Sequence, residues 1–218
     1  LPGYTIDQTR REVTRMITGG RAKWNIPSLE HQVDETDEPP TPLAPAFIDS
    51  LDVAMLPRRR WMLGGTLLRG NVTVVVAPPG VGKSTLGIEQ AVAVVTGREI
   101  TGQTVHEQSK VWIYNNEDDA DELRRRLAAV LQHWDIPFSE VKGRLALNSG
   151  ADRPLLLAKA DRTGNVIRLP DVDACIAHIR EAGIGVFIVD PFVETHEVNE
   201  NANDQIKTVA AMFREIAR

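Results

Sequence analysis

The chain has 218 residues, of which 42% are hydrophobic and 25% are charged, and its formal net charge is −5. This composition is typical of a globular protein with a substantial core. The acidic balance excludes a protein that grips nucleic acid over its whole surface, since such proteins are usually basic. No apolar run is long enough to cross a membrane. The single cysteine, Cys175, leaves no intrachain disulfide and favours a reducing, cytoplasmic location.

Residues 1–46 are expected to form a short helix and a linker that precede the main domain. Apolar residues at helical spacing predict a helix over residues 7–18. Residues 27–45 are acidic and rich in proline, a composition that builds no core and is typical of a linker. We therefore expect the domain itself to span residues 47–218.

From residue 47 onward, segments typical of strands alternate with segments typical of helices. Continuous apolar runs predict strands buried on both faces at residues 72–77, 110–116 and 185–190. Helices are predicted over residues 83–96, 119–134 and 171–182 and in a final segment that aligns Ile206, Val209, Phe213 and Ile216. A small hairpin is expected from residues 154–158 and 165–169. This alternation predicts an α/β fold with a mostly parallel sheet flanked by helices.

The stretch APPGVGKST, residues 77–85, lies between the first predicted strand and the first predicted helix. It has the pattern of a phosphate-binding P-loop, with alanine where the first glycine usually stands. Its glycines allow a backbone whose N–H groups point at phosphate oxygens, and the helix N-terminus adds partial positive charge. We expect ATP here, with the lysine on the β- and γ-phosphates and the serine hydroxyl on Mg²⁺. The expected nucleotide-binding residues are Pro79, Gly80, Val81, Gly82, Lys83, Ser84 and Thr85.

Acidic residues follow the other two apolar runs. Asp190 ends GVFIVD, the Walker B pattern, and is expected to hold Mg²⁺; the alternative is a capping aspartate at the strand end. Pro191 comes next, so no glutamate stands there to activate water. Glu117 directly follows the second run and is our candidate for that catalytic role, with Lys83 as its catalytic partner. Asp118 and Asp119 suit the first turn of the following helix.

Three further features have a functional and an ordinary interpretation. Arg124 lies two helical turns after Glu117 and could cover the adenine ring, or be a surface arginine. The polar segment 195–203 has two interpretations. It is a mobile loop that lies near the γ-phosphate or near the DNA channel, or it is an ordinary helix cap. In residues 58–61, the arginines could meet phosphate and the tryptophan could stack on a base. Alternatively, the arginines are solvated and the tryptophan packs against the sheet edge.

Three stretches together, APPGVGKST, VWIYNNEDDADELRRRL and FIVDPFVETHEVNEN, resemble RecA-like ATPases of the RepA and DnaB type. The most similar are the RepA-like "AAA family" ATPases of plasmids, phages and prophages, and the resemblance covers about residues 47–218. It assigns Glu117 as the catalytic glutamate, Lys83 and Ser84 as the phosphate-loop pair, and Asp190 as the Walker B aspartate. It also implies a hexameric ring that couples ATP hydrolysis to movement along single-stranded DNA, as in a replicative helicase.

Other functions of the same fold remain open. A nucleotide-dependent binding or scaffolding module would hydrolyse ATP slowly or not at all, and related ATPases serve recombination or signalling. The presence of Glu117 favours an ATP-hydrolysing enzyme. A P-loop kinase of small molecules would need an arginine-rich lid, which the sequence does not show.

The chain begins with Leu1 rather than methionine and closes within an expected helix, so we expect a fragment of a longer protein. The resemblance implies that a further strand, a sensor residue and arginines acting on a neighbouring subunit follow Arg218. In RecA-like sheets that further strand lies between the P-loop strand and the Walker B strand. We therefore expect no direct pairing between residues 72–77 and 185–190, and weak ATP hydrolysis by this piece alone.

Overall fold

The computed structural model describes residues 43–218 and divides the chain into two compact units, Leu1–Met55 and Leu56–Arg218. The helix expected at residues 7–18 lies outside the described residues, as does most of the expected linker. In the first unit, every described side chain is exposed, and one short 3-10 turn, η1 (Val53–Met55), is present. The domain boundary expected at residue 47 falls inside this unit.

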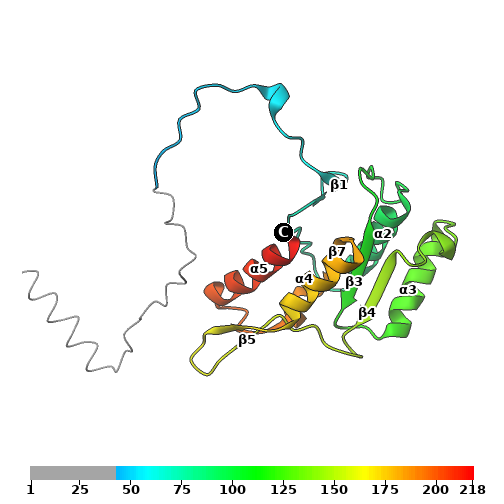
Figure 1. Cartoon of the computed structure of the whole chain (residues 1–218). Coiled ribbons are helices and arrows are strands. Elements are labelled where there is room, and N and C mark those ends of the chain that lie inside the picture. The colour runs from blue at the N-terminus through cyan, green and yellow to red at the C-terminus, as the bar shows by residue number, and fades with distance from the viewer. Residues whose placement is uncertain (1–42) are drawn as a thin grey trace, which may run out of the picture. The chain divides into compact units, whose positions relative to one another are not determined.

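The second unit alternates strands and helices much as the sequence predicts (Figure 1). Its elements in chain order are β1 (Trp61–Leu63), β2 (Leu67–Leu68), α2 (Lys83–Thr96), β3 (Lys110–Asn115), α3 (Ala120–His133), η2 (Phe138–Glu140), β4 (Leu145–Ser149), β5 (Ala158–Ala160), β6 (Val166–Arg168), α4 (Asp171–Ala182), β7 (Ile184–Asp190), η3 (Phe192–Thr195), β8 (His196–Glu197) and α5 (Asn203–Ala217). None of the helices within residues 43–218 is long and apolar enough to cross a membrane.

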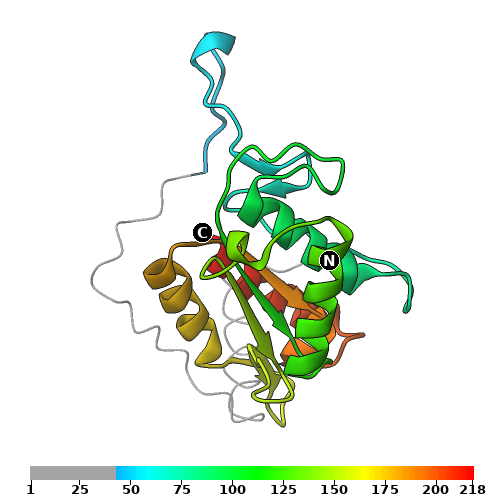
Figure 2. The same cartoon turned by 90° about the vertical axis from the view of Figure 1, so that its right-hand side faces the viewer.

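The central sheet has the order β4-β3-β7, and both pairings are parallel. Because parallel strands need a crossover, α3 connects β3 to β4, and the connection from β4 to β7 includes α4. A second sheet has the order β6-β5-β8, in which β5 and β6 form the expected hairpin, with β5 lying later in the chain than the predicted first arm. The prediction of an α/β fold with a parallel sheet flanked by helices is confirmed (Figures 1 and 2).

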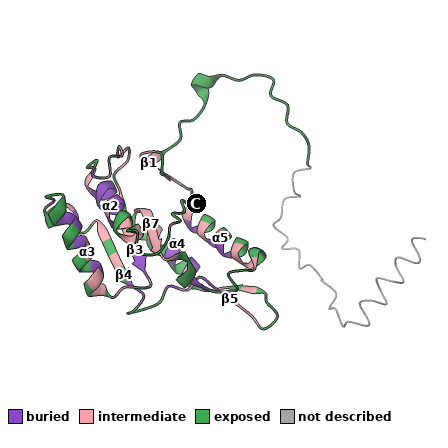
Figure 3. Ribbon diagram, turned by 180° about the vertical axis from the view of Figure 1, so that it is seen from behind, coloured by how far each residue is buried: buried purple, intermediate pink, exposed green. Residues whose placement is uncertain are grey.

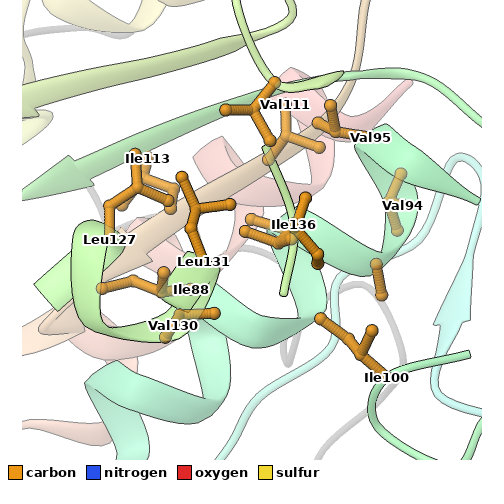
Figure 4. Packing of buried hydrophobic residues seen from close by; sticks show 14 of the residues in the cluster. Ile88, Val94, Val95, Ile100, Val111, Ile113, Leu127, Val130, Leu131 and Ile136 are labelled. Carbon is orange, nitrogen blue, oxygen red and sulfur yellow. The ribbon is translucent and has the colours of Figure 1, made fainter. Parts of the chain in front are cut away.

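Successive residues of the central strands face opposite helical layers, as the pleat of a strand requires. On β3, Val111 and Ile113 pack with α2 and α3 (Figure 4). Trp112 and Tyr114 pack with α4 and α5 on the other face. On β7, Ile188 joins the first layer and Phe187 the second. The buried residues therefore form one core on each side of the sheet, and half of the residues of α2 are buried (Figure 3).

The strand predicted at residues 72–77 is wrong. The segment has no regular strand structure, and Val74 and Val76 are 71% and 88% exposed. A strand is stable only when a neighbour pairs with its backbone N–H and C=O groups. Among the described residues no strand pairs with this segment, and β7 is an edge strand whose residues are all half-buried. Residues 72–77 do not pair with β7, but because they form no strand, the expected strand order stays a prediction.

The second sheet buries one histidine. His196, on β8, is only 7% exposed, and its ring lies 5.0 Å from that of Phe192. Neither ring nitrogen has a hydrogen-bond partner among the described residues. Burial lowers the pKa of His196 below its ordinary value, because the charged form loses its hydration, although the nearby charges of Glu200 and Glu194 oppose this effect. The neutral imidazole is therefore the form that the fold accepts.

This burial predicts a loss of stability in acid. The folded-state pKa of His196 lies below its unfolded value of about 6.5, so the unfolded chain takes up a proton first as the pH falls. The free energy of unfolding should therefore decrease below about pH 6.5, by up to ~1.4 kcal/mol for each pH unit until the folded-state pKa is reached. Urea unfolding between pH 7.5 and 5 should show a smaller decrease in a His196→Leu variant. His133→Leu, at an exposed position, is the control; identical pH dependence in the wild type and His196→Leu would contradict the prediction.

Candidate functional site

The loop before α2 has the backbone of an anion-binding turn. Gly80 and Gly82 have φ angles of 76° and 94°, in the left-handed region that favours glycine. A Cβ atom at either position would meet nothing within 4 Å, so conformation rather than crowding requires these glycines. Gly82 is also the N-cap of α2, and no side chain in the described part of the chain caps this helix. The first N–H groups of α2 are therefore free to bind an anion.

Lys83, the first residue of α2, folds back along the loop. Its Nζ donates hydrogen bonds to the carbonyl oxygens of Ala77 (3.0 Å) and Pro78 (2.9 Å). The side chain is half-buried and bonded to the loop. Ser84 is also half-buried, and Thr85, in the same first turn, is exposed. The ammonium and the serine hydroxyl thus lie next to each other in the chain at the start of α2.

Helix α2 packs close to the carboxyl-terminal part of β7. A Cβ atom on Gly87 would lie 3.7 Å from Cγ2 of Ile188, so the helix backbone passes close to this strand. Gly87 comes about one turn after Ser84, and Ile188 comes two residues before Asp190. Because residues two apart on a strand share a face, the Asp190 side chain points to the α2 face. Helix α2 and the Asp190 side chain therefore lie on the same face of the sheet.

Ser149, Asn115 and Asp190 form a row across the carboxyl ends of the three central strands, which we name the end row. Asn115 pairs in register with Ser149 of β4 and with Asp190 of β7. All three side chains belong to the face that carries α2 and α3, by the alternation along each strand. Nδ2 of Asn115 donates to Oδ2 of Asp190 at 3.3 Å, and Asn115 is only 2% exposed. Within the end row, a side-chain hydrogen bond therefore joins β3 to β7 in addition to the backbone pairing.

Glu117 follows the end row in a turn that is held from two sides. Oδ1 of Asn115 accepts from the backbone N–H of Glu117 (2.9 Å) and of Asp118 (2.7 Å). Oγ of Ser149 donates to the carbonyl oxygen of Asp118 at 2.7 Å. The Glu117 side chain itself is exposed. Its carboxylate is therefore accessible from solvent while its backbone is fixed at the carboxyl end of the sheet.

The two aspartates after Glu117 have structural partners. Asp119 is the N-cap of α3, and its side chain accepts from the N–H of Glu122 at 2.7 Å. Asp118 forms an ion pair of 2.9 Å with Arg126, which also binds Glu122. The pKa of Arg126 is raised, mainly by its hydrogen bond to Glu122 and further by the negative charges of Asp118, Glu122 and Asp190. Both aspartates thus belong to the start of α3, as their sequence positions indicate.

Asn116 connects the end of β3 to two other segments. Its N–H donates to the carbonyl oxygen of Asp190 at 2.8 Å, and its side chain bonds to the backbone of Leu155 and of Glu194. Gly150 must be glycine here, because a Cβ atom would lie 2.5 Å from Cα of Asn116. Neither Asn115 nor Asn116 was among the residues expected at the site. The sequence feature that could have indicated them is a pair of amide side chains at the end of an apolar run, directly before the acidic residues.

The remaining candidates lie at the surface or in ordinary contacts. Arg124 pairs with Asp121 at 2.8 Å, and both side chains are about 70% exposed: 71% and 70%. Trp61 is half-buried in β1, and the segment 195–203 contains β8 and the residues that lead into α5. No side chain of the described chain caps α5, so the helix-cap interpretation of this segment is not observed.

Taken together, these groups fit a nucleotide with a divalent cation. The uncapped start of α2 and Lys83 provide donors and positive charge for phosphate oxygens. The Ser84 hydroxyl and the Asp190 carboxylate are hard oxygen ligands of the kind that Mg²⁺ prefers. A family model described as "AAA domain" matches residues 37–218. The chain therefore belongs to the AAA domain family and is a nucleotide-binding P-loop ATPase domain.

Proposed function

We propose that this domain binds ATP with Mg²⁺ at residues 77–85 and hydrolyses it with Glu117 as the catalytic glutamate. The arrangement around Asp190 is the observation that carries the proposal. Helix α2 packs on β7, and Asp190 at the end of β7 lies on the same face of the sheet as α2. Asn115 connects Asp190 to the turn that contains Glu117. The proposal is supported by hydrogen-bond donors for phosphate oxygens at the start of α2 and by the Asp190 carboxylate and the exposed Glu117 at the carboxyl end of the sheet.

Each residue has a separate role in the proposal. Lys83 exchanges its bonds to the loop carbonyls for bonds to the β- and γ-phosphates, and the N–H groups of residues 79–85 surround the phosphate oxygens. Ser84 and Asp190 hold the cation. Bound Mg²⁺ supplies positive charge that offsets the negative charge of the phosphate oxygens. Glu117 orients the attacking water and accepts its proton.

Arg124 is proposed as a contact of the adenine ring. Its guanidinium is exposed, and its one ion-pair partner within residues 43–218 is another exposed side chain, Asp121. Exposed ion pairs of this kind contribute little to stability, so the arginine can exchange this partner at small cost. A planar guanidinium stacks well on an aromatic ring.

The wider role that we propose is that of a motor domain in a replicative-helicase-like protein. The support is the resemblance of the three quoted stretches to RepA- and DnaB-type ATPases, which implies a cytoplasmic hexameric ring on single-stranded DNA. The acidic net charge of −5 confines any DNA contact to a local surface. The alternative is a binding, scaffolding, recombination or signalling ATPase of the same fold, without helicase activity.

Replacing Lys83 by alanine should weaken nucleotide binding while leaving the fold intact. A charged hydrogen bond contributes roughly 1.5–3 kcal/mol, so the Kd for ATP should rise on the order of 10- to 100-fold, measured with a fluorescent ATP analogue. Lys110→Ala is the matched control, because Lys110 also donates to a backbone carbonyl, that of Ala182, at the other end of β3. A fall of several degrees in the Tm of the nucleotide-free Lys83→Ala variant would show that Lys83 is structural instead.

Replacing Glu117 by glutamine should separate hydrolysis from binding. The amide keeps the size of the side chain but accepts no proton, so turnover should fall about 10²- to 10⁴-fold with ATP affinity retained. Steady-state phosphate release and nucleotide titration measure the two quantities on the same preparation. The control is Glu181→Gln, at the exposed end of α4. Equal turnover in Glu117→Gln and the wild type would favour the binding or scaffolding alternative.

A further inference from the structure

We propose that Asn115 is a positioning residue that fixes the Asp190 carboxylate and the Glu117 turn in one arrangement. This inference rests on the proposed function, in which Asp190 holds the cation and Glu117 activates water. The Asn115 amide lies between the two: Nδ2 donates to Oδ2 of Asp190, and Oδ1 accepts from the N–H groups of Glu117 and Asp118. One side chain thus contacts both halves of the site.

The chemistry of this position requires an amide. Asn115 is 2% exposed, so its polar atoms cannot be satisfied by bulk water. A buried polar group without a partner costs about 1–3 kcal/mol. Toward Asp190 the side chain must donate, because a carboxylate only accepts; toward the turn it must accept, because backbone N–H groups only donate. An aspartate could serve the turn but not Asp190, and an apolar side chain could serve neither.

The contact with Asp190 determines which of its oxygens remains available. Oδ2 is held by the amide, so the rotation of the carboxylate is restricted and Oδ1 carries no bond to Asn115. Partners that orient a metal-binding side chain in this way typically change metal affinity by about 10- to 100-fold when they are removed. Asn115 should therefore affect the dependence on Mg²⁺ although it does not bind the cation itself.

The contact with the turn fixes the other half. The Glu117 side chain is exposed and makes no compensating contact of its own in the described hydrogen-bond network, so its position depends on its backbone. Asn115 holds the N–H groups of this turn, and Ser149 holds the carbonyl oxygen of Asp118 from the neighbouring strand. Displacement of Asn115 would move Glu117 and Asp190 together.

The decisive variant is Asn115→Asp, which keeps the shape and the acceptor but replaces the donor by a second negative charge facing Asp190. Binding of a fluorescent ATP analogue without Mg²⁺ should fall by a smaller factor than binding with Mg²⁺, because the P-loop itself is untouched. The Mg²⁺ concentration that gives half-maximal enhancement of binding should rise at least about tenfold. Asn148→Asp is the matched control: it makes the same change on the adjacent strand, where Asn148 accepts from Nε1 of Trp112 and donates nothing to Asp190 in the described part of the chain.

The outcomes separate this inference from the proposed function. If the wild type binds no nucleotide, the proposed function fails. A second outcome has three parts: the wild type binds ATP, Lys83→Ala weakens this binding, and Asn115→Asp keeps the wild-type dependence on Mg²⁺. That outcome overturns the positioning role of Asn115 and leaves the proposed function standing. A role confined to folding would lower the Tm of Asn115→Asp without moving the Mg²⁺ midpoint, which also overturns it.

A second measurement covers the case in which Asn115→Asp does not fold. The double variant Asn115→Asp/Asp190→Asn reverses donor and acceptor and keeps the net charge, so the contact between the two positions can re-form. Urea unfolding measures the free energy of unfolding of each variant. The double variant should be more stable than the sum of the losses in the two single variants predicts. A single variant that does not fold counts as a loss of the full wild-type stability. Strictly additive losses, or a double variant that is itself unfolded, would show that the two side chains are not coupled and would overturn the inference.

Discussion

The in-register parallel pairing of β4, β3 and β7 is the constraint on which the candidate site depends. It places the last residue of each strand in the same row, Ser149, Asn115 and Asp190, and the alternation along the strands turns all three toward α2. A shift of one residue in any strand would turn its terminal side chain to the opposite face, toward α4 and α5. The apolar cores on both faces oppose such a shift, because it would move Ile113 or Ile188 out of the core that each forms with α2 and α3. Apolar packing along the strands therefore determines the geometry of the site.

The sequence was sufficient to predict the elements that carry a strong local signal. The glycines and lysine of the P-loop, the helical periodicity after residue 119 and the acid that ends GVFIVD all depend on neighbours in the chain, and the resulting α/β fold is confirmed. The strand at residues 72–77 was predicted wrongly for the opposite reason. A run of valines indicates the ability to form a strand, but pairing is a non-local property, and the described chain provides no partner for this run.

The contacts of Asn115 and Asn116 were equally inaccessible to sequence reasoning. An asparagine at the end of a strand is usually a turn residue, and nothing local shows that its amide will meet a carboxylate 75 positions later. The requirement for glycine at position 150 is of the same kind, since it arises from the close approach of Asn116. Patterns in the sequence thus predicted the candidate site residues, whereas the side chains that contact them became visible only once the strands were placed side by side.

The hydrogen bonds of Lys83 change how the thermodynamics of this loop should be considered. With its ammonium on the carbonyl oxygens of Ala77 and Pro78, the lysine already has partners before any phosphate arrives. In the proposed function, phosphate binding is then an exchange of partners, and the affinity is the difference between two sets of bonds rather than the full strength of one. Part of the enthalpy of the new contacts is offset by the loss of the old ones. In return, the same bonds keep the side chain ordered along the loop, so less conformational entropy is lost when the ligand binds.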